Sequence, residues 1–523
     1  MRLNQVLRRA LRYFPGKPAT VFADQRRSYQ ELGDRVRALA AALRRQGLHP
    51  GDRVAIYLHN CPEFLEITYA CFEIGAVIVP LNTRLAADEL VFIINDAECS
   101  AFITGVMLLP TAASFRHRLQ GIHTFISLEA AEGFLSYASL LDSFESTMLY
   151  WLSDAVSPDE EIAGLFYTSG TTGMPKGVML SHGNLWMNAM HTLGVRAPEQ
   201  DGRFLYVAPM FHLATFPAVI NNTLSGGAHV MMERFDLKLW MEIVERERVT
   251  STVLVPTIIN LLLNHPEIGA HDLSSLKRIT YGASPMPLEL LRRAMRSFPG
   301  VEFSQGYGQT ESSPLLTVLL PEDHRLEGTE RELRRLNSCG RPVIGVEVEI
   351  VGEDGLPVRR GEVGEVVARG PNVMRGYWKR PEETAAALRD GWLRTGDMAM
   401  EDEDGYLYLV DRKKDMIISG GENVYSTEVE NALYEHPAIR EAAVIGVPDE
   451  KWGEAVRAIV TLREGATITE QELIDFCGAR LADYKTPKSV EIRGGELPKS
   501  GTGKILKKEL RAPYWQGRSR NIN

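Results

Sequence analysis

Cysteine is scarce in this chain of 523 residues: its five cysteines are scattered and form no Cys-x-x-Cys pair. An odd number without a disulfide framework favours reduced thiols and a cytoplasmic protein. No run of about 18 apolar residues occurs, so no membrane span is predicted. The twelve histidines show no His-Glu-x-x-His or His-x-His spacing, which argues against a zinc site.

Positive charge is in the minority, because 58 lysines and arginines face 68 acidic residues and leave a net charge of −10. This balance disfavours a broad nucleic-acid-binding surface, although it permits a local basic site for an anionic cofactor. Residues 1–14 are basic and amphipathic, and we expect a helix packed on the domain. Peripheral contact with anionic lipid stays open, as does a homodimer.

Short apolar runs alternate with helical spacing through the first 304 residues. Ser28 and Glu31 have the spacing of a capping box before a helix. The alternation predicts mostly parallel sheets with helices on both faces, an α/β fold. The predicted strands cover residues 54–58, 76–79, 204–208, 229–232, 252–255, 278–281 and 301–304.

The pattern changes after about residue 340 to antiparallel strands, which suggest a small β-barrel-like part. Five charged residues at 411–415 then mark a predicted hinge. We expect an N-terminal domain over residues 1–410 and a small, mobile C-terminal α+β domain over residues 416–523. Thr427 and Glu430 have the spacing of a second capping box.

Residues 167–177 are rich in glycine, serine and threonine and contain Lys176, which is typical of a loop that holds phosphate. Apolar runs on both sides predict that the loop joins two strands. It is not a Walker P-loop, because Pro175 stands where the second glycine would be. A solvated turn is the alternative interpretation of such a composition.

Further polar or glycine-containing segments follow predicted strands, where ligands bind in sheets of this kind. They cover residues 209–212, 281–285 and 305–311. Residues 392–397 place an acid after a tight turn, and residues 498–504 form a second lysine loop.

Six of these motifs occur in the order and spacing of the adenylate-forming superfamily, and the chain resembles an acyl-CoA synthetase from end to end. The motifs are residues 168–177, 306–311, 395–397, 411–415, 420–424 and 501–504. The resemblance implies that ATP, Mg²⁺ and coenzyme A are used in two steps. A carboxylate attacks the α-phosphate of ATP to give acyl-adenylate and pyrophosphate, and the thiol of coenzyme A then displaces AMP.

The resemblance also implies residue roles. Tyr307 packs on adenine, Asp397 and Arg412 bind the ribose, and Thr310 and Glu311 serve the α-phosphate and Mg²⁺, with Thr171 also near the metal. Lys504 bridges the carboxylate and the α-phosphate, and Lys414 is the pivot. The other nucleotide-binding residues are Thr168, Ser169, Gly170, Thr171, Thr172, Lys176, Gly282, Ala283, Gly306 and Gly308; Gly420, Gly421 and Trp452 line the thiol path.

The predicted acid pocket is mostly apolar and offers no charge for a free amino group, which weakens an amino-acid-activating alternative. His212 is a catalytic candidate in its wall. The other wall residues are Phe211, Leu213, Phe216, Tyr281, Ala283, Gly306, Ser312, Pro314 and Leu315. We favour a medium- or long-chain fatty acid because nothing polar is dedicated to ring hydroxyls. An aryl acid and a luciferase-like oxygenase stay as alternatives.

Overall fold

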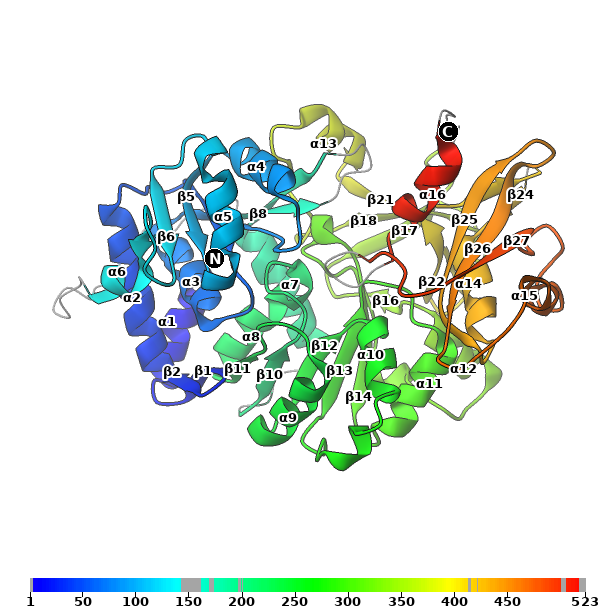
Figure 1. The fold of residues 1–523 in the computed structure, drawn as a ribbon, viewed down its shortest axis with the longest axis horizontal. Helices are drawn as coiled ribbons and strands as arrows, with labels where there is room; N and C mark the ends of the chain where they lie inside the picture. The colour runs from blue at the N-terminus through cyan, green and yellow to red at the C-terminus, as the bar shows by residue number, and fades with distance from the viewer. Residues whose placement is uncertain are drawn as a thin grey trace.

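A computed structural model describes residues 3–142, 161–168, 174–195, 199, 201–412, 415–420, 422–499 and 505–516. Two large sheets and their helices make up most of the molecule (Figure 1), and the C-terminal unit, orange to red, lies at one side. The predicted α/β fold, with a large N-terminal and a smaller C-terminal domain, is confirmed.

The first sheet has nine strands in the described part of the chain, in the order β16-β15-β14-β13-β12-β10-β11-β1-β2. Its central pairs, from β14 to β1, are parallel, and its edge pairs are antiparallel. The strands are β1 (Pro18–Phe22), β2 (Gln25–Ser28), β10 (Arg203–Tyr206), β11 (Ala228–Met231), β12 (Ser251–Leu254), β13 (Arg278–Gly282), β14 (Glu302–Tyr307), β15 (Thr317–Leu319) and β16 (Arg341–Pro342).

The second sheet has eight described strands in the order β19-β9-β8-β4-β3-β5-β6-β7. Its strands are parallel except for the pairs β8–β9 and β9–β19. They are β3 (Arg53–Tyr57), β4 (Val77–Pro80), β5 (Cys99–Thr104), β6 (Thr124–Ser127), β7 (Leu135–Ser136), β8 (Ile162–Thr168), β9 (Lys176–Ser181) and β19 (Gly376–Tyr377).

Two smaller sheets follow along the chain. The predicted barrel-like part is a five-stranded antiparallel sheet, and the C-terminal unit has a mixed sheet of its own. The former consists of β17 (Glu347–Val351), β18 (Gly364–Arg369), β20 (Leu388–Arg389), β21 (Trp392–Glu401) and β22 (Leu407–Arg412). The latter consists of β23 (Ile417–Ser419), β24 (Glu422–Val424), β25 (Ile439–Asp449), β26 (Gly453–Leu462) and β27 (Ser489–Arg493).

Helices cover these sheets because their apolar residues recur at helical spacing. They are α1 (Asn4–Tyr13), α2 (Tyr29–Arg45), α3 (Pro62–Ile74), α4 (Ala87–Asp96), α5 (Leu109–Phe115), α6 (Tyr137–Asp142), α7 (His182–Val195), α8 (Phe216–Ser225), α9 (Leu237–Glu247), α10 (Pro256–Leu263), α11 (Leu288–Ser297), α12 (Glu330–Arg334), α13 (Pro381–Ala387), α14 (Ser426–Tyr434), α15 (Glu470–Gly478) and α16 (Lys507–Arg511). No described helix is long and apolar enough to cross a membrane.

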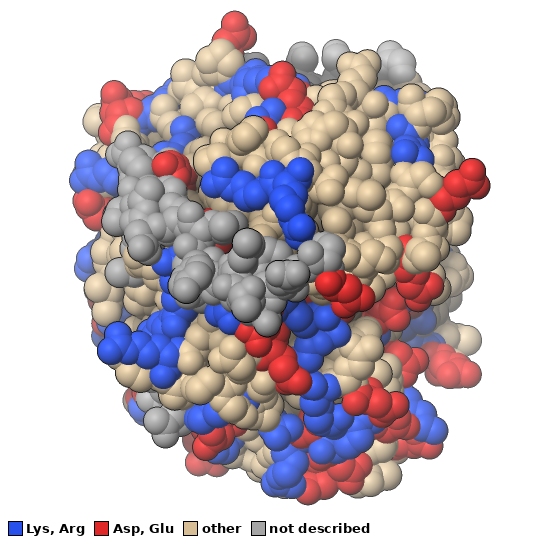
Figure 2. Space-filling model, turned by 90° about the vertical axis from the view of Figure 1, so that its left-hand side faces the viewer, with Lys and Arg blue, Asp and Glu red and all other residues tan. Residues whose placement is uncertain are grey.

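The N-terminal helix α1 packs on the domain as predicted, since Val6, Leu7 and Ala10 are buried in the largest core. Figure 2 looks onto the side of the molecule that carries α2 and α6 in Figure 1. Acidic and basic side chains are interspersed over the described part of this face. No broad field of one sign covers the described part of this face.

One predicted capping box is confirmed and the other is wrong. The Ser28 amide donates to the Glu31 carboxylate at 2.6 Å, and the Glu31 amide donates to the Ser28 hydroxyl at 3.2 Å. In α14, by contrast, the helix begins at Ser426 and its N-cap is Tyr425, so Thr427 lies inside the helix and cannot cap it. Glu430 points into the C-terminal unit, where it accepts a hydrogen bond from the Val444 amide at 2.7 Å.

Glu430 belongs to a buried charge cluster that joins α14, α16 and the end of β22. Lys507 Nζ lies 2.7 Å from Glu430 Oε1 and donates to the Ser426 hydroxyl at 2.6 Å. The Ser426 amide donates to Asp411 Oδ2 at 2.5 Å. Burial alone would lower the pKa of Lys507, but the neighbouring Glu430 and Asp411 carboxylates raise it. Lys507 therefore remains charged and holds two buried acids.

Replacing Lys507 with methionine should destabilise the protein strongly, because Glu430 and Asp411 lose their shared cation. We expect the free energy of unfolding to fall by about 3–5 kcal/mol, the usual effect of stranding a buried charge. Denaturant titration followed by circular dichroism measures the change. The control, Arg369→Met, breaks an exposed ion pair with Glu347 and should barely move the unfolding midpoint. Equal shifts in the two variants would contradict the role of Lys507.

Candidate active site

A cavity of about 3060 Å³ lies where the first sheet, the second sheet and the C-terminal unit meet. Its lining includes the ends of β8, β13 and β14, part of β21, and residues of α14 and α16. Single-ligand pockets measure roughly 300–1,000 Å³, so this cavity has room for more than one reactant.

The predicted phosphate loop joins two antiparallel strands, because Thr168 on β8 pairs with Lys176 on β9. Both residues line the cavity. Lys176 Nζ lies 5.3 Å from the centre of the Tyr377 ring and 3.8 Å from Glu383 Oε1. Glycine at position 177 lets the Tyr167 ring pack closely, since a Cβ there would lie 2.9 Å from that ring. Ser169, Gly170, Thr171 and Thr172 lie outside the described residues.

The ends of β13 and β14 approach each other so closely that side chains do not fit between them. Gly282 pairs with Gly306, and a Cβ on Gly282 would lie 2.3 Å from the Gly306 carbonyl oxygen. A Cβ on Gly308 would lie 1.9 Å from the Pro314 carbonyl oxygen. Ala283 has a φ of +64°, in the left-handed region. Gly282, Ala283, Gly306 and Gly308 all line the cavity, and we call this backbone-lined part of its wall the backbone slot.

Tyr307, Asp397 and Arg412 form one hydrogen-bonded group from three strands. The Tyr307 hydroxyl donates to Asp397 Oδ2 at 2.9 Å, and Arg412 Nε lies 3.2 Å from Asp397 Oδ1. Asp397 on β21 pairs directly with Arg412 on β22, which explains their contact. Burial and the adjacent Asp397 charge raise the pKa of Tyr307, so its hydroxyl stays protonated and remains a donor.

Glu311 lies behind this group, in a short helical turn that begins at Thr310. It is only 9% exposed and accepts a hydrogen bond from the Tyr377 hydroxyl at 2.9 Å. Burial raises the pKa of its carboxyl, and the bond from Tyr377 partly offsets that effect. Among the described residues, no group of three or more His, Cys, Asp or Glu side chains could hold a metal ion. Glu311 would thus need other oxygen ligands beside a cation.

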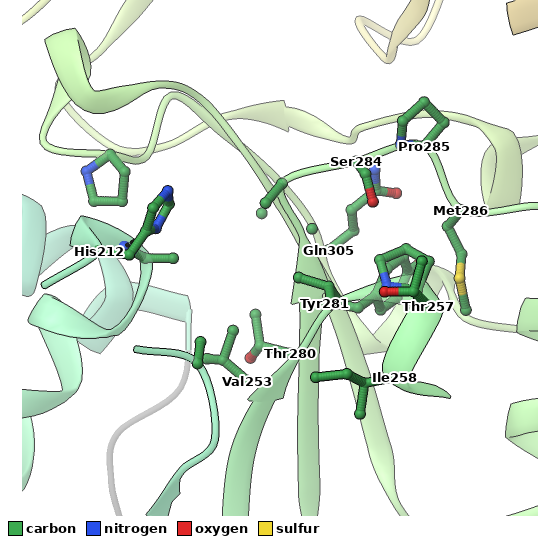
Figure 3. Close-up of a pocket in the computed structure, with 18 of the residues that line it drawn as sticks. His212, Val253, Thr257, Ile258, Thr280, Tyr281, Ser284, Pro285, Met286 and Gln305 are labelled. Atoms are coloured by element: carbon green, nitrogen blue, oxygen red, sulfur yellow. Dashed lines mark hydrogen bonds between the residues drawn. The ribbon is translucent and has the colours of Figure 1, made fainter. Parts of the chain in front are cut away.

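His212 combines a structural and a cavity-facing role. Its Nδ1 accepts a hydrogen bond from the Ala214 amide at 3.2 Å, which leaves the proton of the neutral ring on Nε2. Burial lowers its pKa to about 4, so the ring is neutral near pH 7. Figure 3 shows His212 at one side of the pocket, facing the strands of the first sheet.

Most of the predicted acid wall lines the cavity, and two members do not. Phe211, Leu213, Tyr281, Ala283, Gly306, Pro314 and Leu315 are in the lining. Phe216 packs instead against Phe166 in the core, with ring centres 5.8 Å apart, because its helix turns it away from the cavity. Ser312 is fully buried, and its hydroxyl donates to the backbone of its own loop.

Sequence reasoning missed two groups. Tyr377, which holds Glu311, comes from a two-residue strand that has no periodic signal. Thr280 and Ser304 lie within predicted strands, and their hydroxyls are 3.0 Å apart in the cavity lining. The only signal for this pair was a polar residue at matching positions of two apolar strands. The expectation that nothing polar is dedicated to ring hydroxyls did not take this pair into account.

In the C-terminal unit, Lys499 and Ile505 form an antiparallel bridge and both line the cavity. Trp452 is 39% exposed, and its carbonyl accepts a hydrogen bond from the Gly420 amide at 2.8 Å. Neither Trp452 nor Gly420 is among the described lining residues. Lys414, Gly421 and Lys504 lie outside the part of the chain that the structure describes.

Comparisons with known proteins agree with this geometry. Residues 7–378 match the family model of AMP-binding enzymes, and residues 428–504 match that of the AMP-binding enzyme C-terminal domain. A feruloyl-CoA synthase of Amycolatopsis sp is 42% identical over 493 residues, 93% of this chain and 94% of that protein. An indoleacetate–CoA ligase of Aromatoleum aromaticum is 38% identical and covers 98% of both chains.

A long-chain-fatty-acid–CoA ligase of Mycobacterium tuberculosis, FadD13, is 38% identical over 94% of both chains. The solved structure of the amide bond synthetase McbA from Marinactinospora thermotolerans superposes with a TM-score of 0.87. It is 32% identical and covers 98% of this chain and 100% of that one. The chain therefore belongs to the AMP-binding enzyme family, and within it to the AMP-forming acyl-CoA synthetases.

Proposed function

We propose that the chain converts a carboxylic acid with an apolar body to its coenzyme A thioester through an acyl-adenylate. The observation that carries the proposal is the shared cavity. It brings Lys176, Glu311 and Asp397 of the N-terminal domain together with Lys499 and Ile505, which flank the predicted catalytic lysine loop. Nucleotide and acid can therefore meet between the two domains.

The nucleotide binds along the ends of β13, β14 and β21. Adenine enters the backbone slot at Gly282 and Gly306 and packs against Tyr307. The ribose hydroxyls donate to Asp397, which Tyr307 and Arg412 already hold in place. Thr168 and Lys176 lie on the phosphate side. Such placement leaves the α-phosphate near Thr310 and Glu311.

In the first step, a carboxylate oxygen of the acid attacks the α-phosphorus. A new phosphorus–oxygen bond forms, and the bond to pyrophosphate breaks. Lys504 neutralises the charge that gathers between the carboxylate and the α-phosphate, while His212 donates its Nε2 proton in a hydrogen bond to the acid. Glu311 and phosphate oxygens suit Mg²⁺, which usually has few protein ligands and would supply charge neutralisation.

In the second step, the sulfur of coenzyme A attacks the acyl carbon. A carbon–sulfur bond forms, the bond to the AMP oxygen breaks, and the thiol proton passes to solvent. We place the hinge at residues 411–415, with Lys414 as the pivot that exchanges the lysine loop for the Gly420 and Trp452 face. The described arrangement suits the first step, because the lysine loop's flanks line the cavity while Gly420 and Trp452 do not.

Lys504→Ala should separate the two steps. We expect acyl-adenylate formation to fall by at least about 100-fold, since one preorganised donor is lost from the transition state. Thioester formation from supplied acyl-adenylate should largely survive. Pyrophosphate release and thioester yield measure the two rates. Lys238→Ala, on the exposed side of α9, is the control and should change neither; equal losses in both steps would contradict the assignment of Lys504.

Asp397→Asn should weaken the use of ATP more than Tyr307→Phe does. The first variant removes the charged acceptor, and we expect kcat/KM for ATP to fall about 10- to 100-fold. The second keeps the carboxylate and loses one neutral donor, so a loss below about tenfold is expected. Steady-state AMP release with varied ATP measures both. A larger loss for Tyr307→Phe would place the recognition of ribose elsewhere.

Glu311→Gln should raise the Mg²⁺ concentration needed for half-maximal AMP release by about tenfold or more, because a charged oxygen ligand becomes a neutral one. A Mg²⁺ titration at saturating ATP measures this requirement. Glu349→Gln, at an exposed position of β17, is the control and should leave it unchanged. An unchanged requirement in Glu311→Gln would remove Glu311 from the metal site.

A further inference from the structure

One face of β12, β13 and β14 forms the floor of the cavity below the backbone slot. Alternate residues of a strand point to the same face, so every second residue lies on this floor. The register arranges them in three rows: Gly282 with Gly306, then Val253 with Thr280 and Ser304, then Ser251 with Arg278 and Glu302. All of these residues line the cavity.

The middle row offers a hydrogen-bonding group inside an otherwise apolar stretch. The Thr280 and Ser304 hydroxyls lie 3.0 Å apart, and one donates to the other. That bond uses one of the two hydroxyl hydrogens, so one donor and free lone pairs remain for a ligand. Both residues are partly buried and line the cavity. Figure 3 shows Thr280 beside Val253 on the floor, between His212 and Ile258.

Apolar side chains line the same cavity. Val253, Phe211 and Ala218 are partly buried and pack against the same hydrophobic core, and all three line the cavity. A flat aromatic ring that lies among them gains contact area at little entropic cost. A hydroxyl on the ring would then be able to form hydrogen bonds with the Thr280 and Ser304 hydroxyls.

The bottom row is charged. Arg278 lies 3.4 Å from Glu302, and Lys277 next to it lies 2.7 Å from Glu199. A long alkyl chain that continued past the middle row would bring methylene groups against these charged side chains. Displacing water from charged groups without replacing its hydrogen bonds is unfavourable. The floor therefore suits an acid that ends near the middle row.

We propose that the enzyme selects an aryl acid that carries a ring hydroxyl, which binds to the Thr280–Ser304 pair. The proposal rests on the proposed function, in which the nucleotide binds along the ends of β13 and β14 and the carboxylate meets its α-phosphate. Two residues along a strand span about 7 Å, so the hydroxyl pair lies about that far from the Gly282–Gly306 row, where the proposed nucleotide site begins. In a 3-(4-hydroxyphenyl)propenoic acid, a ring and a two-carbon linker separate carboxyl and hydroxyl over a comparable distance.

The test compares 3-(4-hydroxyphenyl)propenoic acid with its analogue that lacks the hydroxyl, and with saturated fatty acids of eight and sixteen carbons. AMP release with ATP, Mg²⁺ and coenzyme A gives kcat/KM for each acid. We expect the hydroxylated acid to be preferred over its analogue by about tenfold or more, because the analogue leaves the remaining donor of the Thr280–Ser304 pair without a ligand partner. Both fatty acids should react more slowly than the hydroxylated acid.

Three variants test whether the Thr280 hydroxyl causes the preference for the hydroxylated acid. Thr280→Val has nearly the same shape but no hydroxyl, and should lower the preference by about 3- to 10-fold through kcat/KM for the hydroxylated acid alone. Thr280→Ser keeps the hydroxyl and should keep the preference. Thr252→Val makes the same change on the opposite face of the neighbouring strand, where the hydroxyl donates to the Leu205 carbonyl, and should leave the ratio of the two acids unchanged.

The outcomes separate this inference from the proposed function. No AMP release with any acid would refute both. AMP release that is fastest with a fatty acid, or equal for the two aryl acids, would overturn the inference and leave the acyl-CoA synthetase reaction standing. A ratio that Thr280→Val does not change would also overturn it, because the ring hydroxyl would then bind elsewhere.

Discussion

A single buried carboxylate connects the parts of this molecule. Asp397 is 8% exposed, yet it accepts from Tyr307 of the first sheet and pairs with Arg412 at the end of the antiparallel sheet. Arg412 lies two residues before the predicted pivot Lys414, and Asp411 beside it accepts a hydrogen bond from the first amide of α14. The nucleotide-binding edge and the start of the C-terminal unit therefore share one hydrogen-bonded path, so ligand contacts at Asp397 can bear on the hinge.

The sequence predicted the order of strands and helices because that order depends on local patterns. Strand and helix alternation, the Ser28 cap and the strand pair around the phosphate loop are confirmed. The second capping box failed because Glu430 found a stronger partner, Lys507, some eighty residues away. Phe216 failed for a similar reason, since helix phase alone did not show which face meets the core.

The polar residues of the proposed acid site were harder to predict from the sequence, because which side chains meet depends on the register between strands. Thr280 and Ser304 are unremarkable within their own segments, and only the parallel pairing of β13 with β14 brings their hydroxyls together. We favoured a fatty acid from the sequence because no polar residue was dedicated to ring hydroxyls. The three rows of the floor support the aryl acid that we propose instead, because their polarity increases with distance from the backbone slot.

Electrostatics explains why two domains must share the cavity. Glu311, Asp397 and Asp411 place three buried acids near it, and ATP adds several negative charges of its own. Lys176 and Arg412 are two cations of the described N-terminal residues along the proposed nucleotide path, and each already lies near an acid, Lys176 near Glu383 and Arg412 near Asp397. In a cavity of low dielectric this imbalance is costly. The missing positive charge would come from Mg²⁺ and from Lys504, so the C-terminal domain would close most favourably when ATP and the acid are both bound.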